Sequence, residues 1–382
     1  MNVLIIGGAG FIGSRTAFRL LADGHSPVVF DSFDPQIHGD SGLGHVAELR
    51  KCLPVIEGDT RDGAALEKCL GDAEAVFYFP ACTGTGQSMY RAGNYCDVNV
   101  HGAGVFADAL QKFRSRISRV IVSSSRAVYG EGAAKCDNHG RVFPRNRRAA
   151  DMEAGQFEST CPHCGKPVSA LPSREDDAFG PVSIYGITKL AQEMVVANTA
   201  AGAGIPSVIF RYQNVYGPGQ SLANPYTGIL SIFTQLLLGG QAINVFEEGF
   251  ATRDFVFVDD VVEYNCRALT APVSGSAVLN VGMGVRKTIF DLVRALGEAL
   301  GVETRHFVSG DFRLGDIRHA VADTETLFGI LGPMEFTSLE DGVRAFTAWV
   351  TSQELSGQAN ASFQNSLAEM RGAGLLRTAR SS

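Results

Sequence analysis

The chain has 382 residues, of which 45% are hydrophobic and 19% charged, and its formal net charge is -7. This length and composition predict a globular protein with a large core and two lobes. The negative charge argues against nucleic acid or an anionic membrane as a partner. No apolar run reaches the length of a membrane span.

The start of the chain and its cysteines bear on the compartment. The N-terminus enters an apolar strand pattern at Val3–Ile6, without the basic and apolar regions of a signal peptide. Most of the eight cysteines stand singly, which is typical of a reducing environment. These features predict a cytoplasmic protein.

Short β-rich runs alternate with helical patterns through the first half of the chain. This alternation predicts an α/β fold with a Rossmann-like, doubly wound parallel sheet. The predicted strands are Val3–Ile6, Pro27–Asp31, Pro54–Glu57, Ala75–Phe79, Val120–Ser123 and Ser207–Tyr212, and the predicted helices include Ile12–Asp23 and Asn99–Phe113.

The pattern divides the chain into three parts. Residues 1–212 form the predicted Rossmann domain, interrupted at about 131–172 by an insertion rich in Arg, Gly, Pro and Cys. Residues 213–354 are irregular and predict a smaller α/β lobe that closes over a substrate and returns in part to the sheet. Residues 355–382 are polar and weakly helical, which predicts a C-terminal helix or tail.

A glycine-rich turn separates the first strand from the first helix. Its first glycine allows a tight turn, the second a close approach of the backbone to a pyrophosphate, and the third close packing of helix on sheet. The helix N-terminus presents free N–H groups to the anion. Asp31, at the end of the second strand, would accept ribose hydroxyls and repel a 2′-phosphate, so the turn predicts NAD rather than NADP. The alternative is a turn that serves chain geometry alone. The turn comprises Gly7, Gly10, Phe11, Ile12 and Gly13.

Tyr185 and Lys189 stand four residues apart, and so lie on one face of a helix. Lys189 and the oxidised nicotinamide are both cationic, favour phenolate and would together lower the Tyr185 pKa from ~10 toward neutrality. Such a group can take the hydroxyl proton of a carbinol while hydride leaves its carbon. The pair therefore predicts a redox enzyme. A Tyr-x-x-x-Lys spacing is also common on ordinary amphipathic helices. The alternative role of the upstream serine run Ser123–Ser125 is merely to hydrogen-bond nearby backbone groups.

The G-x-x-G-x-x-G spacing, the Tyr-x-x-x-Lys pair and the segment Ser123–Gly130 together resemble the extended short-chain dehydrogenase/reductase family. The resemblance covers nearly the whole chain. Within that family, the chain is most similar to the NAD-dependent epimerases and dehydratases. The resemblance implies that Tyr185 is the catalytic acid/base, that Lys189 holds the nicotinamide ribose and that Ser125 hydrogen-bonds the reacting oxygen.

The resemblance also implies cofactor contacts outside the glycine turn. An aspartate after the third strand would contact the adenine, the turn after the fourth strand would line the cofactor, and an asparagine would hold the active-site helix. The implied residues are Asp31, Asp59, Thr60, Phe79, Pro80, Ala81, Asn99, Ser123, Tyr185, Lys189 and Tyr212.

Substrate contacts follow from the same resemblance. Arginine suits a diphosphate because its planar fork pairs with phosphate oxygens, although each arginine alone would more often be a surface charge. The stretches Gly84–Tyr90 and Ser221–Leu230 resemble the branch of dTDP-L-rhamnose 4-epimerases. The implied substrate contacts are Gln87, Ser88, Ser125, Arg126, Asn214, Asn224, Arg253 and Arg313. Dehydratases of the family place an Asp-Glu pair where this chain has Arg126 and Ala127, so water elimination is not expected.

The insertion carries a C-x2-H and a C-x2-C spacing, each followed by glycine. Two such knuckles supply four ligands for tetrahedral zinc, and metal binding would stabilise a segment with few apolar residues. We therefore predict a structural, zinc-ribbon-like site. A disulfide or idle thiols are the alternatives, and His163 is a geometrically poorer alternative to the histidine ligand. The predicted ligands are Cys136, His139, Cys161 and Cys164.

Together these features predict an NAD-dependent nucleotide-sugar 4-epimerase, an isomerase, acting on a dTDP-6-deoxyhexose or a related sugar nucleotide. The resemblance implies a homodimer that pairs the helices near Asn99–Phe113 and Ser183–Ala201. Two alternatives stay open at this point. One is a 4-ketoreductase with the same Tyr, Ser and Lys, and the other is a non-catalytic protein that senses NAD and binds a partner through its insertion.

Overall fold

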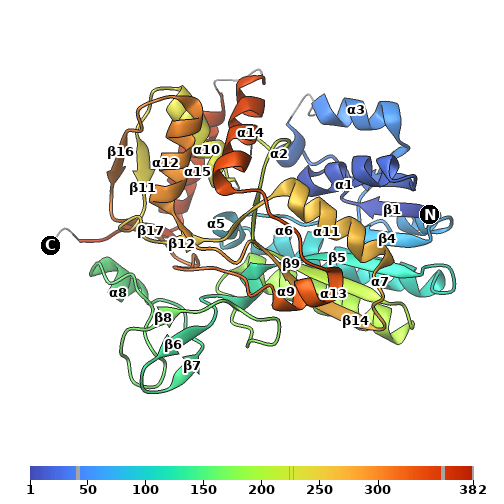
Figure 1. Cartoon of the computed structure of the whole chain (residues 1–382), viewed down its shortest axis with the longest axis horizontal. Helices are drawn as coiled ribbons and strands as arrows, with labels where there is room; N and C mark the ends of the chain where they lie inside the picture. The colour runs from blue at the N-terminus through green and yellow to red at the C-terminus, as the bar shows by residue number, and fades with distance from the viewer. Residues whose placement is uncertain (40–43, 223, 227, 354–357, 381–382) are drawn as a thin grey trace.

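The computed structural model describes residues 1–39, 44–222, 224–226, 228–353 and 358–380. It has a sheet-containing lobe, which holds the N-terminus, and a second lobe at whose far side the C-terminus lies (Figure 1). Five residues of the predicted C-terminal segment and two of the stretch Ser221–Leu230 lie outside the described residues.

A seven-stranded sheet, in which all neighbouring strands are parallel, forms the centre of the first lobe. Its order is β14-β9-β5-β4-β1-β2-β3, so the direction of winding reverses between β1 and β4. Ligands of doubly wound sheets bind outside the carboxyl ends of the strands at this reversal. The predicted Rossmann-like sheet is confirmed. Its strands are β1 (Asn2–Ile6), β2 (Ser26–Asp31), β3 (Val55–Glu57), β4 (Ala75–Tyr78), β5 (Arg119–Ser125), β9 (Ser207–Tyr212) and β14 (Ser276–Val281).

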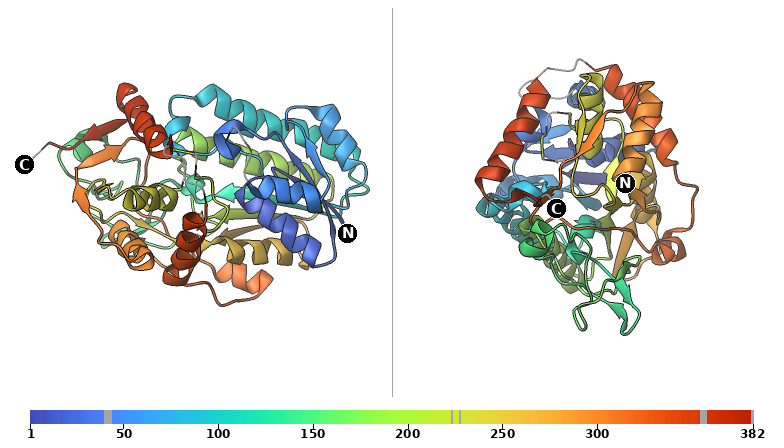
Figure 2. Two further views of the ribbon diagram at one scale, coloured as in Figure 1. Left: turned by 90° about the horizontal axis from the view of Figure 1, so that it is seen from above. Right: turned by 90° about the vertical axis from the view of Figure 1, so that its left-hand side faces the viewer.

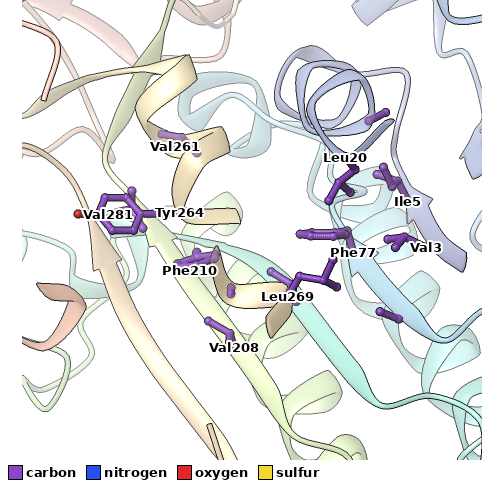
Figure 3. Packing of buried hydrophobic residues seen from close by; sticks show 14 of the residues in the cluster. Val3, Ile5, Leu20, Phe77, Val208, Phe210, Val261, Tyr264, Leu269 and Val281 are labelled. Carbon is purple, nitrogen blue, oxygen red and sulfur yellow. The ribbon is translucent and has the colours of Figure 1, made fainter. Parts of the chain in front are cut away.

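Helices cover both faces of the sheet, which explains why its strands are apolar on both sides. Alternate residues of β1 point to opposite faces, so Ile5 joins one core and Ile6 the other. Figure 3 shows the first core, in which Leu20 and Leu269 pack against Phe77. The helices on that face are α1 (Phe11–Ala22), α3 (Gly44–Cys52), α11 (Val258–Thr270) and α13 (Glu325–Leu331), and those on the other are α4 (Gly63–Leu70), α7 (Gly102–Lys112) and α9 (Ile184–Gly202).

The second lobe has a separate hydrophobic core, built around Leu292, Phe255 and Phe346. The chain returns from the second lobe to the sheet, because α11 and the strand β14 that follows it pack on the sheet, and α13 later joins the same core. The elements of this lobe are α10 (Ile229–Leu238), α12 (Ile289–Leu300), α14 (Leu339–Thr351) and the strand pairs β10 (Asn214–Tyr216) with β13 (Phe255–Phe257), β11 (Ile243–Val245) with β16 (His306–Val308) and β12 (Thr252–Arg253) with β15 (Lys287–Thr288).

The insertion folds as a small antiparallel sheet that projects from the lower side of the molecule (Figures 1 and 2). Its buried hydrophobic cluster contains Ala134 and Val142 together with two of the predicted zinc ligands, Cys136 and Cys161. So few apolar side chains make a weak core by themselves. The elements are β6 (Ala134–Cys136), β7 (Gly140–Val142), β8 (Ser169–Ala170) and α8 (Ala149–Glu153).

The C-terminal segment is a helix, α15 (Gln358–Gly372), followed by the strand β18 (Leu376–Thr378). The strand pairs antiparallel with β17 (Asp311–Arg313) of the second lobe. Leu367, Met370 and Leu376 are buried there, and this apolar contact gives a mostly polar segment an ordered place. Within the described residues, no helix combines the length and apolar character needed to cross a bilayer.

Candidate active site

The glycine turn lies at the reversal point of the sheet and touches the turn after β4. A Cβ atom at Gly7, whose φ is 73°, would lie 2.9 Å from the Pro80 nitrogen. A Cβ atom at Gly13 would lie 2.5 Å from the Gly7 carbonyl oxygen. Both positions therefore require glycine. Gly10 caps α1 without a side-chain hydrogen bond to the helix, which leaves N–H groups of the first turn, where Phe11 and Ile12 lie, available to an anion.

Asp31 lies at the carboxyl end of β2, beside this turn. Its carboxylate accepts hydrogen bonds from the backbone N–H groups of Ala9, at 2.9 Å, and of Phe33, at 3.0 Å. The side chain is buried and held in one orientation. A fixed carboxylate at this place fits the ribose hydroxyls of NAD.

This carboxylate should make the protein select NAD over NADP, because it would repel the 2′-phosphate of NADP. Calorimetric titration of cofactor-free protein should give a far lower Kd for NAD. The Asp31→Asn variant keeps the size of the side chain and removes its charge, so it should narrow the difference. Equal affinity of the wild-type protein for the two cofactors would contradict the prediction.

Asp59 and Thr60 follow β3 on the same edge of the sheet. Arg61 donates two side-chain hydrogen bonds to the Asp59 carboxylate, at 2.8 and 2.5 Å, and these hydrogen bonds lower the pKa of Asp59. Asp59 is thus anionic and held at the edge of the sheet, and it is the residue for which the adenine contact was predicted. Thr60 is buried against Gly102 of α7.

Tyr185 lies in the first turn of α9, which begins where the Ser183 hydroxyl accepts a hydrogen bond from the Gly186 N–H group. Ser125 ends β5, and a hydrogen bond joins its side chain to the Tyr185 phenol. The structure therefore brings these two predicted catalytic residues together.

The electrostatics of Tyr185 in the protein alone are set first by burial. Desolvation raises the pKa of Tyr185, while the hydrogen bond with Ser125 and the charge of Arg126 oppose the rise. Arg126 is thus a cation of the protein whose charge favours the ionised phenol. Burial lowers the pKa of Lys189 itself to about 7.

Lys189 is buried one helical turn beyond Tyr185, and its ammonium group is fixed by acceptors. The Nζ atom donates to the Ser123 carbonyl oxygen at 2.6 Å and also to Oε1 of Gln192. Gln192 in turn donates to the Pro80 carbonyl oxygen at 2.9 Å. This chain of hydrogen bonds connects the lysine to the turn after β4, which comprises Phe79, Pro80 and Ala81.

The sequence analysis missed Gln192 and its neighbour Glu193. Glu193 accepts a hydrogen bond from Ser124 at 2.5 Å and pairs with Arg211 at 2.6 Å. Gln192 and Glu193 stand three and four residues after Lys189, on the side of α9 that faces the sheet. Polar residues at that spacing, on a face that must be buried, are the signal that could have identified them.

Asn99 connects the chain after β4 with α9. Its side chain exchanges hydrogen bonds with the Cys82 backbone, at 2.7 and 3.1 Å, and donates to the Thr188 hydroxyl on α9 at 3.0 Å. Tyr212, predicted to contact the cofactor, ends β9, and its hydroxyl donates to Asn265 at 2.6 Å.

Three arginines predicted to bind substrate gather around one carboxylate, Asp316. Arg253 pairs with it at 3.1 Å. Desolvation raises the Asp316 pKa, but the charges of Arg253, Arg313, Arg126 and also Arg147 outweigh it, so that the pKa is lowered. Desolvation lowers the Arg126 pKa to about 10. The Nε atom of Arg313 is buried and has no hydrogen-bond partner in the described part of the chain. Three cations around one anion leave an excess of positive charge, which suits a diphosphate.

The remaining predicted substrate contacts differ in whether their polar side-chain atoms already have hydrogen-bond partners within the protein. Asn214 accepts a hydrogen bond from Arg126 at 3.1 Å. Gln87 exchanges amide hydrogen bonds with Gln36, at 3.1 and 2.9 Å, and Ser88 donates to a backbone carbonyl within its own helix, α5 (Thr85–Ser88). The Nδ2 atom of Asn224 is buried and, among the described residues, has no hydrogen-bond partner, so it remains available to a ligand.

The four predicted zinc ligands converge within the insertion, with their ligand atoms all within 4.8 Å of one another. The Cys136 sulfur lies 3.5 Å from Nδ1 of His139 and 3.7 Å from the Cys164 sulfur, and the Cys161 sulfur lies 3.6 Å from the same nitrogen. Zinc–ligand bonds of about 2.0–2.3 Å place tetrahedral ligand atoms about 3.3–3.8 Å apart. The three distances given above lie in that range, two of them to His139, and the described cysteines are free thiols.

Comparison with known proteins places this site in a family. The model of the NAD dependent epimerase/dehydratase family matches residues 3–282. The dTDP-L-rhamnose 4-epimerase of Burkholderia thailandensis is 37% identical over 357 residues, which cover 93% of this chain and 96% of that protein.

Solved structures agree with the sequence comparison. UDP-glucose 4-epimerase of Thermotoga maritima, solved with UDP-glucose, is 27% identical with a TM-score of 0.74 and covers 92% of this chain and 99% of its own. MoeE5 in complex with UDP-glucuronic acid and NAD is 27% identical with a TM-score of 0.73 and the same two coverages. From the matched residues, the shared fold and the identity over nearly its whole length, this chain belongs to the NAD dependent epimerase/dehydratase family.

Proposed function

We propose that the chain is an NAD-dependent nucleotide-sugar 4-epimerase whose substrate is a dTDP-6-deoxyhexose or a related sugar nucleotide. The observation that carries the proposal is the pairing of Ser125 with Tyr185 at one end of the site and the cluster of three arginines at the other. The first pair suits a reacting carbinol and the second a diphosphate. The likeness to dTDP-L-rhamnose 4-epimerase over nearly the whole chain supports this assignment.

The cofactor would lie across the reversal point of the sheet. The α1 N-terminus would hold the pyrophosphate, Asp31 the adenosine ribose and Lys189 the nicotinamide ribose. Bound NAD supplies a hydride acceptor that can return the hydride to the same carbon. The residues of the site fit this role because the first turn of α1 presents its N–H groups at the reversal point and the Asp31 carboxylate lies beside it at the end of β2.

In the proposed reaction, Tyr185 takes the C4 hydroxyl proton of the sugar and later returns it. Ser125 hydrogen-bonds the same oxygen and holds it against the phenol. Arg126 favours the ionised phenol by its charge, so it helps Tyr185 to act as a base. The arginine cluster holds the diphosphate while the 4-keto sugar turns over and presents its other face.

Three alternatives are less well supported. A 4-ketoreductase would use the same residues but would release its cofactor after each turnover. A dehydratase would need carboxylates beside Ser125, where this chain has Arg126 and Ala127. A purely NAD-sensing protein would not need the Ser125–Tyr185 pair together with the arginine cluster.

The fate of the C4 hydrogen distinguishes an epimerase from a ketoreductase. With a dTDP-6-deoxyhexose deuterated at C4, the epimer should keep its label, because the hydride never leaves the site, and no cofactor should need to be added. NMR and mass spectrometry of the product would measure this. Loss of deuterium to the external cofactor pool, or product formed only with stoichiometric NADH or NADPH, would assign the chain as a ketoreductase.

We further propose that the insertion holds one structural zinc through Cys136, His139, Cys161 and Cys164. The support is geometric. Each knuckle is followed by a glycine in the left-handed region, Gly140 at φ 65° and Gly165 at φ 70°, which turns the chain around the metal position. The protein's thiols would remain reduced in the cytoplasm, the compartment that we propose for it.

A homodimer built on α7 and α9 is also proposed. Ile187 and Met194 stand seven residues apart on one face of α9 and are 49% and 51% exposed. Apolar side chains at this spacing form a stripe that a second helix can cover. Sedimentation equilibrium should give twice the chain mass of 40.7 kDa, and a single-chain mass would contradict the dimer.

A further inference from the structure

The insertion meets the second lobe through a network of buried charges. The Arg147 side chain, from the insertion, is only 3% exposed and pairs with Glu131 at 3.1 Å and with Glu247 of the second lobe at 2.8 Å. Arg318, from the second lobe, is 2% exposed and pairs with the same Glu247 at 2.6 Å. One carboxylate thus receives an arginine from each part of the protein.

Further contacts run in both directions across this junction. Arg318 also pairs with Glu158 of the insertion, at 2.7 Å, and with Glu248, at 2.5 Å. The Glu131 carboxylate accepts the backbone N–H of Arg318 at 3.1 Å. Glu247 adopts a φ of 53°, a conformation that non-glycine residues keep only where surrounding contacts enforce it.

The network reaches the proposed diphosphate site through the loop 316–318. Arg147 donates to the Asp316 carbonyl oxygen at 3.2 Å. On its other side, the same loop holds Arg253, which donates to the Arg318 and Ile317 carbonyl oxygens, at 3.0 and 2.9 Å, and to the Asp316 carboxylate, at 3.1 Å. Arg253 therefore takes its position from a loop that the insertion braces.

Stability alone gives little reason for this arrangement. Burying charges requires that each be paired, and apolar side chains of similar volume often stabilise a junction as well or better. The two arginines and their carboxylates instead fix one orientation of the loop, because a guanidinium fork and a carboxylate bond in few geometries.

From these contacts we infer that Arg147 is a positioning residue for the diphosphate site. The insertion is then a wall of the substrate site, and its inner face is used to orient Arg253 and Asp316 rather than to recruit a partner protein. This inference rests on the proposed function, since it assumes that the arginine cluster binds the diphosphate of a sugar nucleotide.

The test compares nucleoside diphosphates with monophosphates, because only the diphosphate should depend on the arginine cluster. Calorimetry would measure the affinity of the NAD-loaded protein for dTDP, UDP, dTMP and UMP. The Arg147→Lys variant keeps the positive charge but loses the planar guanidinium. We expect it to lower the affinity for dTDP or UDP by about 3- to 30-fold. The monophosphate affinity and the NAD content should not change, and KM for the sugar nucleotide should rise more than kcat falls.

Arg141 provides a matched control within the insertion, because it donates to Asp177 and to the Pro172 carbonyl oxygen. Arg141→Lys should leave the diphosphate affinity as in the wild type. Equal losses for mono- and diphosphates, or equal losses in the Arg147 and Arg141 variants, would overturn the inference, as would an unchanged KM in Arg147→Lys. If the wild-type protein itself binds diphosphates no better than monophosphates, both the inference and the proposed function fail.

Discussion

Replacing Tyr185 by phenylalanine should lower kcat by about 10²–10⁴-fold, which is the range that general acid–base groups supply. The substitution removes only the hydroxyl that hydrogen-bonds with Ser125 and that, in the proposed reaction, exchanges the proton of the sugar's C4 hydroxyl. The ring still fills its place at the start of α9, so the fold and the NAD content should remain those of the wild type. Steady-state kinetics with the sugar nucleotide and cofactor analysis of the purified variant would measure both effects.

A second Tyr→Phe substitution separates chemistry from packing. Tyr264 lies in α11, where its hydroxyl donates to the Gly332 carbonyl oxygen at 3.3 Å. Tyr264→Phe also removes a phenolic hydroxyl but should leave kcat near the wild-type value. A Tyr185→Phe enzyme that retained wild-type kcat would show that another group moves the proton, and a variant that lost NAD would show that the phenol serves the cofactor instead.

The role of Arg126 connects this prediction with the choice of reaction. In a dehydratase the residues after Ser125 would be carboxylates that exchange protons with leaving groups. Here that place holds a cation, which hydrogen-bonds to Asn214 and opposes the high pKa of the Tyr185 phenol. A positive charge at this point favours a phenolate and cannot serve as a second acid/base at neutral pH. An arginine at the place where a dehydratase has a carboxylate therefore argues for alcohol oxidation and against water elimination.

Much of the sheet lobe could be predicted because its strands, turn and helices follow from patterns of residues close together in the sequence. Runs such as Val3–Ile6 and Ser207–Tyr212 are apolar throughout, and this is the pattern of strands that helices cover on both faces. The glycine turn was recognisable because Gly7 and Gly13 each meet backbone atoms that exclude a side chain. Spacing alone placed Tyr185 and Lys189 on one helix face.

Other parts of the site depend on contacts between distant segments, which no local pattern reveals. The junction of Arg147 with Glu247 joins residues one hundred positions apart in the chain. The C-terminal strand β18 adds to β17 beside Arg313, although its own sequence is short and polar. Burial sets the direction of the Tyr185 and Lys189 pKa shifts in the protein alone, and residue spacing carries no information on burial.

Removing a zinc ligand should have the largest effect on stability, and the effect should be confined to the insertion. Elemental analysis of protein purified without chelator should find one zinc per chain. Cys161→Ser should lose that zinc and unfold the segment around β6 and β7, because metal binding contributes about 10–16 kcal/mol in small zinc peptides. Limited proteolysis within residues 131–172 would detect the loss, and Cys52→Ser, which changes an exposed cysteine in the sheet lobe, is the matched control.

The consequences of losing zinc should follow the contacts of the insertion. The glycine turn and Asp31 lie in the sheet lobe, so NAD should remain bound in Cys161→Ser. Arg147 and Glu158 belong to the insertion, and loosening it would release the loop that holds Arg253, so the affinity for a nucleoside diphosphate should fall. Metal-free wild-type protein with an intact insertion, or a disulfide between Cys161 and Cys164, would rule out the zinc site. The Arg147 inference would then still rest on its own buried contacts, because none of them passes through the metal ligands.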